Sequence, residues 1–188
     1  YIIHVGRLTT RKKISKLIDI YASFKEKRLD HIGLVIVGDG PHKATLQNYA
    51  LSKGLRDIVF TGAMSSESIL TSKYIFSADI MVIPGNLGLT VNHAFFFGKP
   101  VVGFVISENE RPPKNYLHGP EHEYLLDDFN GKIVRDESVE SYIAAITQIL
   151  DNNLYSDNAL DYARKNLTVQ EMAQGYLEAI KFVKRKNA

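Results

Sequence analysis

The chain has 188 residues, of which 45% are hydrophobic, so it is long enough and apolar enough to bury the core of one domain. Its 23 basic and 21 acidic residues leave a net charge of +2, which gives no indication of a nucleic-acid partner or of binding to an acidic membrane. The absence of cysteine excludes disulfides, thiol catalysis and cysteine-ligated zinc, and it fits a reducing compartment.

Short apolar runs alternate with segments in which apolar residues recur at helical spacing, and this alternation predicts repeated strand and helix units. We expect an α/β fold with a doubly wound parallel sheet of about six strands flanked by helices. The expected strands cover residues 1–5, 33–37, 57–62, 79–83, 100–105 and 131–134. The expected helices cover residues 14–27, 41–51, 65–76, 87–97, 138–150, 155–165 and 169–184. Because the chain opens on a strand at Tyr1, we also expect it to be a piece of a longer protein.

Four of the expected strands end in glycine, at Gly6, Gly38, Gly62 and Gly85. In a parallel sheet the carboxyl ends of the strands lie along one edge, and ligands of such folds bind outside that edge. The sequence therefore predicts a binding cleft lined by these turns.

Positive charge is concentrated directly after the first strand, where Arg7 and Lys12 precede a helix. Cations at a helix start oppose the helix dipole, so this placement is unfavourable unless an anion is bound there. Across the expected cleft, the segment Leu87–Thr90 opens another helix, and Gly88 lets an anion approach its backbone N–H groups. Two cations and a helix start fit a diphosphate, with a solvated basic turn as the alternative.

The second strand ends in the sequence Gly38-Asp39-Gly40, which invites comparison with dinucleotide-binding loops. The third glycine position of that motif holds Lys43, and no acidic residue stands at the end of the next strand to bind a ribose. These departures argue against a nicotinamide-dependent enzyme.

The segment 106–119 is long for a connection between a strand and a helix, so we expect it to be functional or mobile. A short helix begins after it, with Pro120 in its first turn and Glu121 and Glu123 where the helix dipole favours acids. Helix-start chemistry alone is one interpretation of the two acids, and a role in the site is the other.

Taken together, an ordered set of short motifs resembles the carboxyl-terminal, donor-binding half of the retaining GT-B glycosyltransferases of group 1, the GT4 family. The motifs are GR with a lysine five residues after the arginine, VGDGP, FTG, SADIMVIPG, GLTVNHAFFFGKPVV, GPE and NGKIV. They cover about residues 1–150. The resemblance implies a single Rossmann-like domain over 1–188 that holds a UDP- or GDP-sugar, with helices over 151–188 that pack towards an amino-terminal acceptor domain outside this chain.

The resemblance also implies roles for individual residues. The donor diphosphate is expected at Gly6, Arg7, Lys12, Leu87, Gly88, Leu89 and Thr90. The donor ribose and base are expected at Thr61, Gly62, Ala63, Met64 and His93.

The chain departs from the family at a pair of glutamates spaced eight residues apart, whose positions are held here by Gly85 and His93. His93 can hydrogen-bond a hydroxyl, although a core-facing structural histidine is the alternative. The carboxylate that contacts the donor sugar has no replacement in place. His93 and Glu121 are therefore the candidate catalytic residues.

The implied reaction transfers a sugar to a hydroxyl acceptor with retention, in polysaccharide or glycoconjugate synthesis. No DxD motif stands near the site to hold a metal, so we expect metal-independent catalysis and no cofactor. The expected partners are the nucleotide-sugar and an acceptor glycan or lipid-linked glycan bound through the absent domain. The expected location is cytoplasmic, with peripheral association at the inner face of the membrane.

Two other interpretations stay open: a catalytically degenerate nucleotide-sugar-binding module, and a nucleotide-sugar epimerase of the same architecture. The isolated chain is expected to bind nucleotide weakly and to transfer nothing.

Overall fold

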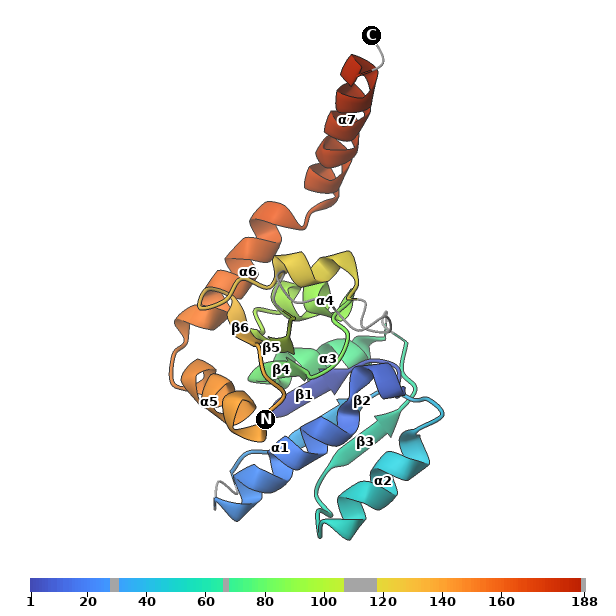
Figure 1. Ribbon diagram of the computed structural model, residues 1–188, viewed down its shortest axis with the longest axis vertical. Coiled ribbons are helices and arrows are strands. Elements are labelled where there is room, and N and C mark those ends of the chain that lie inside the picture. The colour runs from blue at the N-terminus through green and yellow to red at the C-terminus, as the bar shows by residue number, and fades with distance from the viewer. Residues whose placement is uncertain (28–30, 66–67, 107–117, 187–188) are drawn as a thin grey trace.

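The computed structural model describes residues 1–27, 31–65, 68–106 and 118–186. Its centre is a six-stranded parallel sheet in the order β3-β2-β1-β4-β5-β6, which confirms the predicted fold class (Figure 1). The strands are β1 (Ile2–Val5), β2 (Leu34–Val37), β3 (Val59–Gly62), β4 (Ile80–Ile83), β5 (Val101–Phe104) and β6 (Gly131–Val134). Each strand lies within the range expected from its apolar run.

The strand order reverses direction between β1 and β4. The chain runs outward from β1 through β2 to β3, then returns to the other side of β1 as β4 and continues outward to β6. β1 pairs in parallel with both β2 and β4, with Ile2 opposite Leu34 on one side and Ile80 on the other. A crevice therefore opens at the carboxyl ends of β1 and β4, which is where doubly wound sheets bind ligands.

Helices cover both faces of the sheet, so its strands are almost continuously apolar. On one face Ile2, Ile36 and Val82 pack with α1 and α5, and on the other Ile3, Val37 and Met81 pack with α3, α4 and α6. The helices are η1 (Thr10–Lys12), α1 (Ile14–Glu26), α2 (Lys43–Ser52), α3 (Ile69–Ser77), α4 (Thr90–Phe96), η2 (Pro120–Tyr124), α5 (Val139–Leu150), α6 (Leu154–Asn166) and α7 (Val169–Lys186).

The start of α3 corrects one sequence prediction, because the helix begins after Ser68 and not at Ser65. The Ser68 hydroxyl accepts a hydrogen bond of 3.2 Å from the Leu70 N–H and caps the helix. The carbonyl of Ser65 instead accepts from the Thr71 hydroxyl at 2.7 Å, outside the helix. Both serines fit the capping pattern, and Ser68 is the one that caps the helix.

α6 and α7 differ in how they meet the rest of the domain. α6 packs against α4, where its Ala159 and Ala163 are buried, whereas its Tyr155 is buried in the core cluster that includes α5. α7 extends away from the sheet and its helices (Figure 1). Its large apolar side chains are more than half exposed: Val169, Met172, Tyr176, Leu177, Ile180, Phe182 and Val183. Among the described helices, none is both long enough and apolar enough to cross a membrane.

The loop after β4 packs directly on the turn after β1. The Asn86 N–H donates to the Arg11 carbonyl at 3.0 Å, and the Lys12 ammonium donates to the Asn86 carbonyl at 2.6 Å. Between these bonds, a Cβ on Gly85 would overlap the Arg11 carbonyl oxygen and lie 2.6 Å from the Lys12 carbonyl carbon. Gly85 is therefore required for the two loops to approach each other.

We predict that Gly85→Ala lowers the free energy of unfolding by about 2 kcal/mol or more, because the added methyl group meets backbone atoms that cannot rotate away. Gly88→Ala is the matched control, since its Cβ would meet no heavy atom within 4 Å, and its cost should stay within about 0.5 kcal/mol. Urea unfolding of both variants measures the difference. Equal losses in the two variants would contradict the packing role of Gly85.

Candidate functional site

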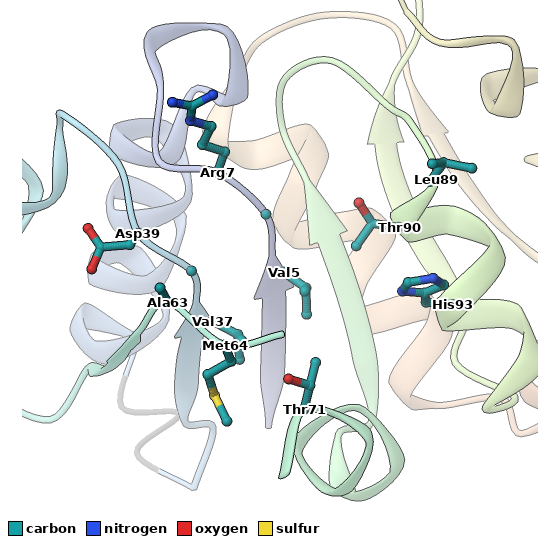
Figure 2. A pocket seen from close by; sticks show the side chains of 12 residues that line it. Val5, Arg7, Val37, Asp39, Ala63, Met64, Thr71, Leu89, Thr90 and His93 are labelled. Carbon is teal, nitrogen blue, oxygen red and sulfur yellow. The ribbon is translucent and has the colours of Figure 1, made fainter. Parts of the chain in front are cut away.

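A cavity of about 520 Å³ lies at the carboxyl ends of β1 and β2, between the turn that follows β3 and the start of α4 (Figure 2). It occupies the crevice at the reversal of the strand order. The residues that line it are Val5, Gly6, Arg7, Val37, Gly38, Asp39, Ala63, Met64, Thr71, Leu89, Thr90 and His93.

The two sides of the cavity carry different chemistry. In Figure 2, Arg7 follows β1 at one rim, while Thr90 and His93 project from α4 on the opposite side. Arg7 is exposed, which leaves its guanidinium accessible to a ligand. His93 is half-buried and lines the cavity, so its ring faces the site rather than the core.

Asp39 lies at the β2 side of the cavity, where its carboxylate is held by neighbours. Its Oδ2 pairs with the Lys43 ammonium at 3.0 Å, and its Oδ1 accepts from the Gly40 N–H at 2.7 Å. The hydrogen bond from Lys43, followed by that from Gly40, lowers the pKa of Asp39 below its ordinary value. The carboxylate is therefore ionised and already paired at neutral pH.

Lys12 lies beside the cavity without lining it. A Cβ on Gly6 would lie 3.8 Å from the Lys12 Cε, so the lysine stem runs next to a residue of the cavity wall. Burial lowers the pKa of Lys12, and the negative charge of Glu121 opposes that shift. The ammonium is partly desolvated, which strengthens its interaction with an anion.

The loop that leads into α4 contributes only part of the expected amide cluster. The Leu87 N–H donates to the His118 Nδ1 at 3.2 Å, which corrects the expectation that this amide faces the diphosphate. The first helical bond runs from the Val91 N–H to the Gly88 carbonyl, so Leu89 and Thr90 precede it and line the cavity. Gly88 lies next to them but does not line the cavity.

Below Gly6, His4 is a fully buried polar residue that does not line the cavity. Its Nδ1 lies 2.9 Å from the Val82 carbonyl, which can only accept, so Nδ1 carries the proton. Its Nε2 has no hydrogen-bond partner in the described structure and lies 3.4 Å from where a Gly6 Cβ would stand. Burial lowers the pKa of His4 to about 4, and the nearby charge of Lys12 adds to this effect.

The structure divides the residues predicted from sequence into three groups. The cavity gathers Gly6, Arg7, Ala63, Met64, Leu89, Thr90 and His93. Thr61 and Gly62 precede it at the end of β3, where the Gly62 carbonyl accepts from the Gly38 N–H at 3.0 Å. The third group lies beside the cavity: Leu87 and Gly88 belong to the loop between β4 and α4, and Lys12 and Glu121 lie next to that loop.

Two polar residues of the cavity were missed by the sequence analysis. Asp39 stands between the glycines after β2, and its position at a strand end was an available signal. Thr71 is a buried helix residue whose pattern resembles any amphipathic turn, so the sequence gives no signal for it. In the described parts of the chain, no group of three or more His, Asp or Glu side chains could hold a metal ion.

We predict that acid destabilises the protein through His4. The unfolded chain binds a proton at the ordinary histidine pKa of about 6.5, whereas the folded protein keeps His4 neutral down to about pH 4. The contribution of neutral His4 to the free energy of unfolding is therefore fully present above pH 6.5 and is lost as the pH drops towards 4. Between pH 7 and pH 5, the wild-type protein should lose on the order of 2 kcal/mol more than His4→Asn, whose amide can still donate to Val82.

Urea unfolding of the two proteins at both pH values tests this prediction. His118, whose pKa is also lowered to about 4 by burial and then by His122, is present in both proteins, so its contribution cancels. Losses of equal size in the two proteins would show that His4 does not carry the effect.

Comparison with family models matches residues 1–166 to the family described as Glycosyl transferases group 1. Among curated proteins, the chain is 27% identical over 191 residues to the sulfoquinovosyl transferase of Arabidopsis thaliana, which covers 89% of the chain and 36% of that protein. It is 30% identical over 105 residues to the alpha-D-kanosaminyltransferase of Streptomyces kanamyceticus, covering 54% of the chain and 26% of that protein. The chain therefore spans about a third of the length of these relatives.

Solved structures share the fold at low identity. The pneumococcal O-GlcNAc transferase GtfA, in complex with UDP and GlcNAc, has a TM-score of 0.75 at 18% identity and covers 97% of this chain and 35% of its own. Anabaena HepE with UDP and glucose has a TM-score of 0.73 at 18% identity, covering 96% and 47%. The C-terminal domain of LpcC from Francisella tularensis, a group 1 protein, has a TM-score of 0.68 at 18% identity and covers 90% and 87%. The fold is thus the Rossmann-like half of a GT-B structure.

Proposed function

Because this chain belongs to the group 1 glycosyl transferases, we propose that it is the donor-binding half of an enzyme that transfers a sugar from a nucleotide-sugar to a hydroxyl acceptor. The observation that carries the proposal is the cavity at the reversal of the sheet, with Arg7 on one side and Thr90 and His93 on the other. A nucleoside diphosphate has an anionic centre and a flat base, and this cavity has a cationic rim and a mostly apolar floor.

The diphosphate is assigned to the cations after β1. Arg7 lies at the cavity rim and Lys12 lies next to Gly6. Leu89 and Thr90 line the opposite side at the start of α4, where the first N–H groups of a helix have no intrahelical partner. Each charge-assisted hydrogen bond to a phosphate contributes about 1.5–3 kcal/mol. The same groups stabilise the charge that develops on the departing diphosphate, which is the main electrostatic requirement of the transfer.

The nucleoside is assigned to the remaining walls of the cavity. Ala63 and Met64, in the turn after β3, offer backbone groups and an apolar surface to the base. His93 faces them from α4, across the cavity, and provides a ring nitrogen for a ribose hydroxyl (Figure 2). Thr61 and Gly62 are the last residues of β3 and lead directly into this turn.

The proposal extends to the reaction's outcome and setting. Similar proteins have been solved with UDP together with GlcNAc or glucose, which supports a UDP-sugar as the donor, with a GDP-sugar as the second choice. From the family resemblance we assign two features of the reaction. The transfer retains the configuration at the anomeric carbon of the sugar, and protein cations neutralise the charge on the departing diphosphate. The acceptor glycan binds the other half of the protein, onto which the apolar face of α7 docks. The absence of cysteine supports a cytoplasmic location, at the inner membrane face when the acceptor is lipid-linked.

A nucleotide-sugar-binding module without activity is the second candidate, and Gly85 favours it. The family places a glutamate at this position, but here no side chain fits without displacing the turn after β1. Turnover by the full-length protein separates the two candidates.

We predict that Arg7→Ala and Lys12→Ala each weaken binding of UDP to this chain about tenfold or more, because each variant removes a charge-assisted bond. Arg11→Ala is the matched control: Arg11 is an exposed cation of the same turn that does not line the cavity, and its removal should change affinity less than twofold. Titration calorimetry with UDP and with GDP measures the effect and identifies the preferred base. Equal affinity in all four proteins would reject the diphosphate assignment.

For the full-length enzyme, we predict that His93→Ala lowers kcat/KM for donor hydrolysis or transfer about tenfold, because the ribose loses a hydrogen bond to the imidazole ring. Initial rates over a series of donor concentrations measure the change. Unchanged rates would remove His93 from the site, and an inactive wild-type protein that still binds UDP would favour the binding module.

A further inference from the structure

Beside the nucleotide cavity, a second cluster joins Lys12, the loop before α4 and the start of η2. Two hydrogen bonds connect the loop to the segment before η2: the Leu87 N–H donates to the His118 Nδ1 at 3.2 Å, and the Gly119 N–H donates to the Leu87 carbonyl at 2.9 Å. The Lys12 ammonium binds the other end of the same loop at the Asn86 carbonyl. The cluster therefore fixes the positions of three separate parts of the chain relative to one another.

Glu121 places its carboxylate inside this cluster. A Cβ on Gly119 would overlap the Glu121 Oε2, and the same point lies 3.4 Å from the Gly88 Cα and from the Leu87 carbonyl oxygen. The carboxylate is therefore folded back over Gly119, towards the loop before α4, and does not extend into solvent from η2. Its negative charge acts on Lys12, which lies on the other side of that loop.

The segment that carries Glu121 is held in place beside α4. η2 is preceded by Gly119, whose carbonyl lies 2.9 Å from the His122 Nδ1, and the rings of His118 and His122 stack with their centroids 5.2 Å apart. η2 also packs against α4. These contacts fix the backbone from which the Glu121 side chain extends, which limits where its carboxylate can lie.

The position of Glu121 along the cleft is also informative. The base is assigned to Ala63 and Met64 on the β3 side, and the diphosphate lies between Arg7 and α4. A sugar attached to the second phosphate must extend away from the base, past Lys12 and towards the α4 side. Glu121 lies at that end, beside Gly88.

The loop before α4 supplies no carboxylate at position 85, where the family resemblance implies a glutamate that contacts the donor sugar. Gly85 is packed against backbone atoms of Arg11 and Lys12, so no side chain fits there. We propose that Glu121 takes over this task and is the residue that accepts hydrogen bonds from hydroxyl groups of the transferred sugar. The inference rests on the proposed function, since it specifies the sugar end of the same site.

A sugar-contacting carboxylate and a merely structural acid at a helix start make different predictions. A carboxylate beside Lys12 repels the donor diphosphate, so neutralising it should leave UDP binding unchanged or slightly tighter. Loss of hydrogen bonds to the sugar should weaken only ligands that carry one. The measured quantity is therefore the ratio of the UDP Kd to the nucleotide-sugar Kd, which a general loss of folding does not change selectively.

The experiment compares the wild-type chain, Glu121→Gln and Glu123→Gln by titration calorimetry. The ligands are UDP, UDP-glucose, UDP-galactose and UDP-N-acetylglucosamine, with GDP and GDP-mannose as the corresponding guanosine pair. Glu123 is the matched control, because it lies two residues away on η2, is exposed and pairs only with His122 at 3.4 Å among the ion pairs of the described chain.

For the sugar that the wild-type chain binds best relative to its nucleotide, Glu121→Gln should lower the affinity ratio about tenfold, and Glu123→Gln should change it less than twofold. An unchanged ratio in Glu121→Gln for every sugar would overturn the inference. So would an equal fall in Glu123→Gln, or a parallel loss of UDP binding in Glu121→Gln. Failure of the wild-type chain to bind either nucleotide would instead reject the proposed function.

Discussion

The contact between the turn after β1 and the loop after β4 is the constraint on which the site depends. These two loops belong to the strands between which the sheet reverses, and they meet through backbone atoms at Gly85 and through the hydrogen bonds of Asn86. The contact sets how far Arg7 and Lys12 stand from the start of α4. Because backbone atoms make it, side-chain motion cannot loosen it, and the proposed diphosphate site is held in place without a ligand.

The same contact explains the main departure of this chain from its family. A glutamate at position 85 would require the turn after β1 to move outward, and with it both cations. The chain instead has a closely packed loop and a carboxylate, Glu121, that approaches from η2. Two opposing effects act on the pKa of Lys12 in this arrangement: burial favours its neutral form, and the negative charge of Glu121 favours its ammonium form.

The sequence was a good guide to the sheet, because each strand is a mostly apolar run bounded by glycine or proline, and β2, β4 and β5 are buried along their whole length. Arg7 could be placed at the cavity because it follows a strand end, whereas Ala63, Met64 and His93 were placed there by the family resemblance. Contacts between distant segments could not be predicted in this way. The use of the Leu87 amide by His118, 31 residues away, is one example, and the burial of Thr71 is another. Lys12 was predicted at the site, and in the structure its stem runs beside the cavity wall, with the Cε 3.8 Å from where a Gly6 Cβ would stand.

α7 has a consequence for how the protein behaves when handled alone. A single helix of this length is only marginally stable in water, and packing of an apolar face normally supplies the missing stability. Its valine, methionine, tyrosine and isoleucine side chains repeat at spacings of three and four residues and face solvent. A purified fragment that keeps this helix should therefore bind to hydrophobic resins and self-associate, whereas one that stops after α6 should stay monodisperse.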